Sequence, residues 1–251
     1  MSKTLKGKSV ISAIYMQRSA RVSLIVLSSN PDIAVNVRRS TQAKQITLRV
    51  SALDGRVSIT APSRVPMHDI EAFLLEKETW LRDKVSGMPE QVQVTFYTTI
   101  PIHGVLHHIV PSAGKKLKIY ENQLHIPKKI KMPETNTLVF LKILAHEKIL
   151  KEADFYAGKL GFPYIKISLR DAKSRWGSCN DQGAMMFSWR LIMAPPKVLS
   201  YVVAHEVAHL KHMNHSSQFW NEVRSLFGDY REERRWLREN GATLHKYKFK
   251  Y

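Results

Sequence analysis

The run from Ala204 to His215 constrains this chain more than any other part of its sequence. It contains the pattern His-Glu-x-x-His, made by His205, Glu206 and His209, among apolar residues with the spacing of a packed helix. Residues four apart lie on one helical face, with side chains roughly 5–6 Å apart. Two imidazoles at that separation can bind one metal ion, and Glu206 then lies beside the open coordination position of that ion. The pattern therefore predicts a metal-binding helix.

A third ligand must come from outside this pair, because a catalytic zinc takes three protein ligands and leaves one position for water. His212 continues the helical face, but it lies about 10.5 Å from His205 along a helix axis, too far to share a tetrahedral ion. His215 follows Asn214, a residue type that tolerates the left-handed conformation at helix ends, so the chain can turn back there. We therefore favour His205, His209 and His215 as the ligands of one zinc ion per chain. His212 is interpreted as a solvated cation at the helix end.

Further motifs surround the metal-binding helix on both sides. They are Ser174-Arg175-Trp176-Gly177-Ser178-Cys179, Trp189-Arg190-Leu191, Ala194-Pro195, Tyr201 to Leu210, Met213-Asn214-His215-Ser216 and Phe219-Trp220. Together these residues resemble the YgjP-like metallopeptidases, predicted zinc-dependent hydrolases related to the SprT and Wss1 proteases. The resemblance extends over roughly residues 33–240 and is densest across 164–225.

The resemblance implies an α+β fold with a β-rich N-terminal region and a zincin-like metallopeptidase domain. It implies that His205, His209 and His215 hold zinc, and that Glu206 acts as general base and acid in peptide bond hydrolysis. Ser188 departs from the family pattern, which usually has Asn before Trp-Arg-Leu, so no polar role is carried over to that position.

Other residues near these motifs have two interpretations. Arg175 and Trp176 are candidate cleft residues, with Arg175 as an oxyanion stabiliser, but a packed Trp beside a surface Arg would give the same sequence. The strand predicted from Gly183 to Leu191 could pair with an extended peptide substrate. Cys179 is interpreted as a small buried thiol.

Several residues imitate the functional pattern and are interpreted as structural. His103, His107 and His108 lie on a predicted strand, where residues four apart are about 13 Å apart. His146 and Glu147 begin a false motif, because Leu occupies position 150. Aromatic residues at helical spacing indicate a core rather than substrate contacts. They are Phe219, Trp220 and Trp236.

The chain is predicted to divide into three parts. Residues 1–30 contain five basic residues and no acidic one, which indicates a basic tail, although a transit peptide would share this composition. Residues 31–133 form the β-rich region, with a hairpin turning at Asp54-Gly55, one helix over 69–85 and further strands over 92–127. After a basic linker ending at Pro133, residues 134–251 form the catalytic domain.

The net charge of +18 and the pI of about 10.0 favour a polyanionic partner such as DNA. One alternative is therefore a DNA-associated protease, and another is a nucleic-acid-binding module with structural zinc. Hydrolysis of a non-peptide amide is a third alternative. A single cysteine in 251 residues indicates a reducing, cytoplasmic location. No apolar run reaches the roughly 20 residues of a membrane span.

Overall fold

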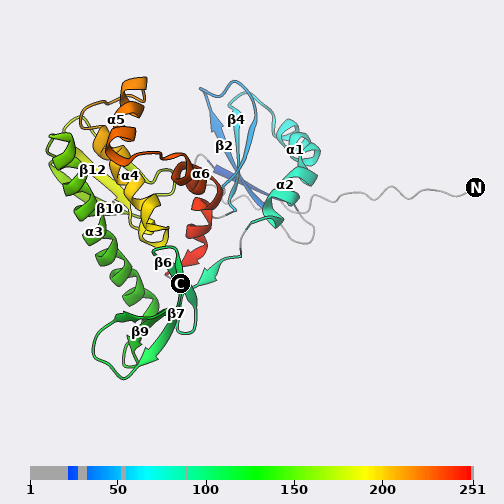
Figure 1. Ribbon diagram of the computed structural model, residues 1–251. Helices are drawn as coiled ribbons and strands as arrows, with labels where there is room; N and C mark the ends of the chain where they lie inside the picture. Colours follow the sequence, from blue (N-terminus) through cyan, green and yellow to red (C-terminus); the bar gives the residue numbers. More distant parts are fainter. Residues whose placement is uncertain (1–21, 28–32, 52–54, 89, 250–251) are drawn as a thin grey trace, which may run out of the picture. The chain divides into compact units, whose positions relative to one another are not determined.

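The computed structural model describes residues 22–27, 33–51, 55–88 and 90–249. The chain divides into two compact units, residues 1–89 and residues 90–251 (Figure 1). Both units combine strands and helices, so the fold class is α+β, as predicted. Among the described residues, no helix is both long and apolar enough to cross a bilayer.

The first unit is a four-stranded sheet with two helices. Its strands are β1 (Val22–Leu27), β2 (Ile33–Ser40), β3 (Thr47–Val50) and β4 (Val57–Pro62), in the order β1-β2-β4-β3. The predicted hairpin is confirmed by the antiparallel β3–β4 pair, and Gly55, just before β4, has a φ of +68°. The helices α1 (Met67–Glu76) and α2 (Glu78–Ser86) pack Ile70, Leu74 and Leu81 against the sheet.

Two details of the first unit differ from the prediction. Residues 22–27 form a strand that pairs with β2, and buried Ile25 and Leu27 contribute to the core, so the basic tail does not extend to residue 30. The single helix expected over 69–85 is two helices, because Lys77 leaves the helical conformation with φ −94° and ψ 5°. The predicted tail residues 1–21 and the turn residue Asp54 lie outside the described residues.

The second unit contains three small sheets and the longest helix of the described chain. Its strands are β5 (Val92–Gln93), β6 (Thr99–Ile102), β7 (Val105–Ser112), β8 (Lys118–Tyr120), β9 (Gln123–Pro127), β10 (Lys166–Arg170), β11 (Gly177–Cys179), β12 (Ala184–Ser188) and β13 (Tyr247–Lys248). Its helices are α3 (Pro133–Leu160), η1 (Trp189–Met193), α4 (Pro196–Ala208), α5 (Ser217–Phe227), α6 (Arg231–Asn240) and η2 (Gly241–Lys246).

The unit boundary at residue 89 lies before the predicted division at residue 133. The reason is the hydrophobic core, since strand residues such as Ile109 and Leu124 are buried in the same cluster as Leu141 of α3 and Phe187 of β12. The C-terminal strand β13 also pairs with β5, which connects the two ends of this unit. Pro133 begins α3 instead of ending a linker.

The sheet beside the metal-binding helix has the order β10-β12-β11. Strand β12 pairs with β10 in parallel and with β11 in antiparallel orientation, so it is the central strand. The prediction that the 183–191 strand offers a free edge to a peptide is therefore wrong. The pattern of residues showed a strand, but pairing partners far away in the sequence decide whether a strand is central.

Candidate metal centre

Helix α4 presents the first two histidines. The helix begins at Pro196, whose missing N–H would have no helical acceptor in the first turn, and it ends at Ala208, with His209 as the C-cap. Its last turn tightens, because the amide of His209 donates to the carbonyl of Glu206 at 3.2 Å and the amide of Leu210 donates to that of Val207 at 2.9 Å. The rings of His205 and His209 remain on one face, with centroids 5.2 Å apart.

The segment between α4 and α5 brings in the third histidine. Ser216 caps α5 by accepting a hydrogen bond from the amide of Phe219 at 3.4 Å, and this fixes the position of the preceding His215. The Nε2 atoms of His215 and His205 are 3.2 Å apart, and one ring nitrogen from each of the three histidines lies within 4.8 Å of the other two. Tetrahedral ligands at about 2.0–2.1 Å from zinc would be roughly 3.3 Å apart. The donor set therefore fits a tetrahedral transition-metal ion with one position left open.

A main-chain carbonyl orients His209. Its Nδ1 atom lies 2.9 Å from the carbonyl oxygen of His212, so Nδ1–H donates and Nε2 keeps the lone pair for a metal. The ring of His212 turns toward Glu222, with 3.7 Å between Nε2 and a carboxylate oxygen. His212 thus contributes its carbonyl group to the site, whereas its ring lies outside the group of three.

Burial favours the neutral form of His205 and His209, which is the form that binds metals. It lowers the pKa of His205 to about 3, and the neighbouring His209 and His215 lower it further. Burial also lowers the pKa of His209, although the hydrogen bond to His212 acts in the opposite direction.

Aromatic rings surround the three histidines. The fully buried ring of Phe219 lies 4.9 Å from His205, 4.4 Å from His209 and 4.8 Å from His215 between centroids. Trp220 stacks on His215 at 5.6 Å. The sequence did not reveal that Phe219 and Trp220 pack against the histidines. Their helical spacing indicated that they are buried, but not which side chains they contact.

Glu206 lies next to the histidines against strand β11. The residue is 5% exposed, and this burial raises the pKa of its carboxyl group to about 8, while the charge of Arg175 acts to lower it. A Cβ atom on Gly177 would lie 2.6 Å from both Cγ and Oε1 of Glu206, so only glycine permits this approach. The sequence contained Gly177 as part of a motif, but its contact with Glu206 depends on the packing of β11 on α4.

The two candidate cleft residues differ in their surroundings. Arg175 is exposed, and its positive charge acts to lower the pKa of the Glu206 carboxyl group. Trp176 is half-buried and packs on η2, with its ring centroid 5.5 Å from that of His245. A Cβ atom on Gly241 would lie 2.9 Å from the Trp176 ring.

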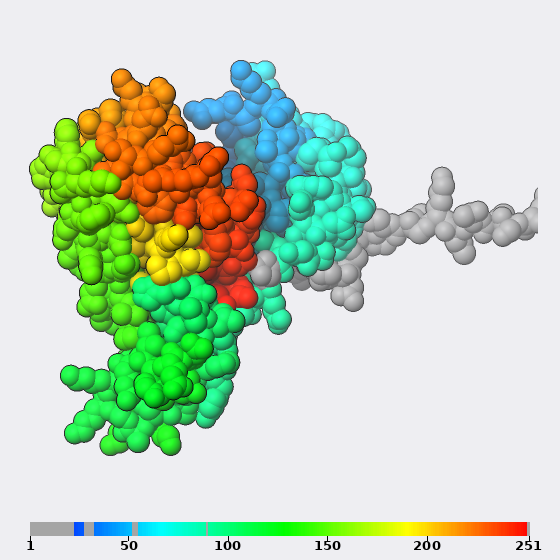
Figure 2. Space-filling model, viewed as in Figure 1, coloured from blue at the N-terminus to red at the C-terminus, as the bar shows by residue number. Residues whose placement is uncertain are grey.

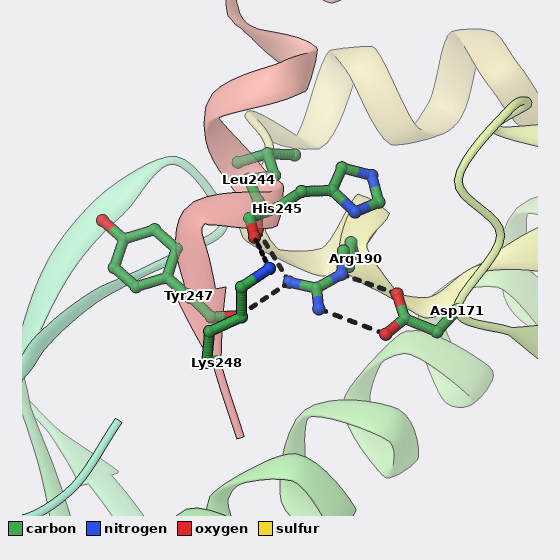
Figure 3. Close-up of polar contacts among 6 residues, drawn as sticks. All are labelled: Asp171, Arg190, Leu244, His245, Tyr247 and Lys248. Carbon is green, nitrogen blue, oxygen red and sulfur yellow. Dashed lines mark hydrogen bonds and ion pairs between the residues drawn. The ribbon is translucent and has the colours of Figure 1, made fainter. Parts of the chain in front are cut away.

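Buried Arg190 holds η2 and the C-terminal strand in place (Figure 3). It forms an ion pair with Asp171 at 2.7 Å, and its Nη1 atom donates to the carbonyls of Leu244 at 2.8 Å and Tyr247 at 3.2 Å. Its guanidinium carbon lies 4.6 Å from the centroid of the Trp189 ring. The Trp-Arg-Leu motif therefore connects the C-terminal segment to the sheet that carries β11.

The remaining sequence candidates lie apart from the three histidines. His103 lies in the turn between β6 and β7, while His107 is buried and His108 exposed on β7. The Oγ atom of fully buried Ser188 has no hydrogen-bond partner among the described residues. Burial raises the pKa of the Cys179 thiol to about 11, with a further contribution from Glu206. Within the described part of the chain, His205, His209 and His215 form the one group of three side chains able to hold a metal ion.

The α+β fold and the convergent histidines define a metal-dependent peptidase of the zincin-like class. The sequence matches the YgjP-like metallopeptidase domain over residues 44–240, so the chain belongs to the YgjP-like family. Among solved structures, the metallopeptidase zymogen abylysin of Pyrococcus abyssi is similar, with 24% sequence identity and a TM-score of 0.34 over 37% of this chain and 95% of that one. No curated protein matches the chain.

Proposed function

We propose that the chain is a zinc-dependent peptidase in which His205, His209 and His215 hold one zinc ion and Glu206 is the general base. One observation carries this proposal, namely the convergence of three imidazole nitrogens within 4.8 Å, beside a buried carboxyl group. An open position next to a proton-accepting group distinguishes a catalytic zinc site from a structural one.

The chain's own residues perform the proton transfers. Zinc bound by neutral imidazoles would polarise the substrate carbonyl and lower the pKa of a water molecule toward about 7. The positive charge of a bound zinc ion would favour the carboxylate form of Glu206. This carboxylate accepts one proton of the water, whose oxygen forms the new bond to the carbonyl carbon. When the C–N bond breaks, Glu206 delivers that proton to the leaving nitrogen. The products are a carboxylic acid and an amine, and transfer of the second water proton from one to the other gives a carboxylate and an ammonium group, so no other reactant is needed.

The edge of β11 suits the binding of an extended peptide substrate. The amide of Ser188 donates to the carbonyl of Trp176, and the amide of Asn180 donates to the carbonyl of Ala184. These two bonds show which residues along the β11–β12 pair exchange hydrogen bonds and which, in alternation, do not. In an antiparallel pair with this alternation, the backbone groups of Gly177 and Cys179 point away from β12. Because Gly177 lies against Glu206, this edge borders the metal centre. An added strand would place its scissile bond beside the three histidines.

The single cysteine supports a cytoplasmic location for this activity. Cys179 is a free, half-buried thiol, and a chain without disulfides suits a reducing compartment.

The test of the proposal compares zinc content with peptide cleavage in three proteins. We expect about one zinc per chain in the wild type, loss of zinc in His215→Ala, and retained zinc without cleavage in Glu206→Gln. Wild-type protein that binds no zinc after reconstitution would contradict the metal site. Retained cleavage in Glu206→Gln would contradict the role of the base, and zinc binding without cleavage of any peptide in a library would favour a structural zinc module.

A further inference from the structure

Six exposed lysines gather at one end of the β6-β7-β9-β8 sheet, which we call the lysine end. Strands β7 and β9 are parallel and end together, with Ser112 paired to Pro127, and β8 begins at the same end because it is antiparallel to β9. The amide of Lys128 donates to the carbonyl of Ser112 at 2.9 Å, which joins the two loops. The lysines of this end are Lys115, Lys116, Lys118, Lys128, Lys129 and Lys131.

The described acidic residues do not compensate the charge of these lysines. None of the six has an ion-pair partner within the described ranges. The acidic residues nearest in sequence do not neutralise them, since Glu121 lies in the turn at the opposite end of β8 and Glu134 is buried in α3. Six uncompensated positive charges on adjoining loops create a potential that attracts a polyanion.

The outer face of the same sheet provides a surface for bases. Side chains of directly paired residues share a face, so Lys118, Tyr120, His108 and His125 lie on the face opposite the buried Ile109 and Leu124. The Tyr120 side chain is 62% exposed. An exposed aromatic ring beside a row of cations is the combination that binds single-stranded nucleic acid, with phosphates on the cations and a base on the ring.

The lysine end lies away from the peptidase centre. Gly104, which precedes β7, packs on Pro195 at the start of α4, since a Cβ atom at position 104 would lie 3.0 Å from the Pro195 Cα atom. The eight residues of β7 then carry the chain about 26 Å further, at roughly 3.3 Å per residue. The lobe formed by these strands projects from the rest of the second unit (Figure 2). A nucleic acid bound there would leave the β11 edge open to a peptide.

We propose that the lysine end and the outer face of the β6-β7-β9-β8 sheet bind single-stranded nucleic acid. This binding is separate from peptide hydrolysis and does not depend on the metal. The phosphate backbone supplies the affinity, so binding is sensitive to salt and tolerant of sequence.

The experiment measures fluorescence anisotropy of a labelled, mixed-sequence DNA strand of about 20 nucleotides with the full chain, in about 50 and about 200 mM salt. If all six lysines contact phosphates, a plot of the logarithm of affinity against the logarithm of salt concentration has a slope of about −4. The affinity then falls about 250-fold between the two salt concentrations. Replacing Lys115, Lys116, Lys128 and Lys129 by Ala should weaken binding at least about ten-fold and reduce the slope to about −1.4. Tyr120→Ala should weaken binding about ten-fold and leave the slope unchanged.

The matched control replaces four exposed lysines elsewhere in the second unit by Ala and should retain most of the affinity; they are Lys142, Lys151, Lys166 and Lys197. Far-ultraviolet circular dichroism and cleavage of a short peptide should be unchanged in the four-lysine variant, which separates this proposal from the peptidase proposal. No binding by the wild type at about 50 mM salt overturns the proposal, and so does equal binding by the four-lysine variant. Binding to phosphatidylserine vesicles without binding to the oligonucleotide also overturns it and indicates a lipid surface.

Discussion

Gly177 and Glu206 are in contact across the β11–α4 interface, and the absence of a side chain at position 177 makes this contact possible. A Cβ atom there would lie 2.6 Å from Cγ and Oε1 of Glu206, closer than real carbon atoms approach. The position of the proposed base therefore depends on a residue that performs no chemistry.

Gly177→Ala should displace the Glu206 carboxylate and reduce kcat by about 100-fold, because a shift of about 1 Å in a catalytic group has an effect of that size. Zinc content should be unchanged, since the three atoms nearest to the added Cβ atom all belong to Glu206 and not to a histidine. Gly158→Ala is the matched control, because nothing lies within 4 Å of its added Cβ atom. Unchanged kcat in Gly177→Ala would contradict the role of this contact.

Phe219→Leu should weaken zinc binding by about ten-fold, because the ring of Phe219 packs against all three histidines and restricts their rotamers. Competition with a chromogenic zinc chelator measures the affinity. Phe187→Leu is the matched control, because it removes a fully buried ring from the same core and should destabilise the fold to a similar extent, by about 1–2 kcal/mol. Equal zinc affinity in the two variants would show that the packing of Phe219 is only structural.

Cys179→Pro tests the edge of β11. Proline removes an amide that points away from β12, so the β11–β12 hydrogen bonds remain. We expect KM for an extended peptide to rise about ten-fold, the effect of one lost hydrogen bond of about 1.4 kcal/mol. Cys179→Ala keeps the amide and should retain the wild-type KM, and zinc content reports on the integrity of both variants. A wild-type KM in Cys179→Pro would place the substrate elsewhere.

The sequence predicted the local parts of this site and missed those that depend on long-range packing. The spacing of His205 and His209 is a property of one helix, and Asn214 before His215 indicated a turn, so the sequence identified the residues that the structure brings together. In contrast, the central position of β12 depends on pairing with β10 and β11, which no local pattern encodes.

The division of the chain illustrates the same limit. The alternating residues of 92–127 indicated strands, and strands are present, but their buried side chains share a core with α3. A proline before a helix resembles a linker in the sequence, whereas Pro133 is the first residue of α3. Hydrophobic periodicity identifies the buried face of an element but not the element it packs against.

Arg190→Met should destabilise the second unit by about 2–4 kcal/mol, because it leaves the buried carbonyls of Leu244 and Tyr247 without their donor and removes the partner of Asp171. Asp171→Asn should have a smaller effect, about 1 kcal/mol, because the Asp171 side chain is 50% exposed and water can replace part of the interaction. Urea denaturation monitored by tryptophan fluorescence measures both values. A smaller loss of unfolding free energy in Arg190→Met than in Asp171→Asn would contradict the role of Arg190 in holding the C-terminal segment.

His245 should make the fold sensitive to acid. Burial lowers its pKa from 6.5 to about 4, and the nearby Arg190 lowers it further, against the opposing effect of Asp171. Because the folded pKa is below the unfolded one, the stabilisation is present above pH 6.5 and is lost as the pH falls through 4. The difference corresponds to about 2–3 kcal/mol of unfolding free energy.

The measurement compares the wild type with His245→Phe, which keeps a ring beside Trp176 and cannot be protonated. Between pH 6.5 and 4 the free energy of unfolding of the wild type should fall by about 2–3 kcal/mol more than that of the variant, since all other titrating groups are common to both proteins. Urea denaturation of zinc-free protein at each pH avoids the separate effect of proton competition at His205, His209 and His215. Parallel stability curves for the two proteins would mean that protonation of His245 is not linked to unfolding, and that its ring is hydrated in the folded state.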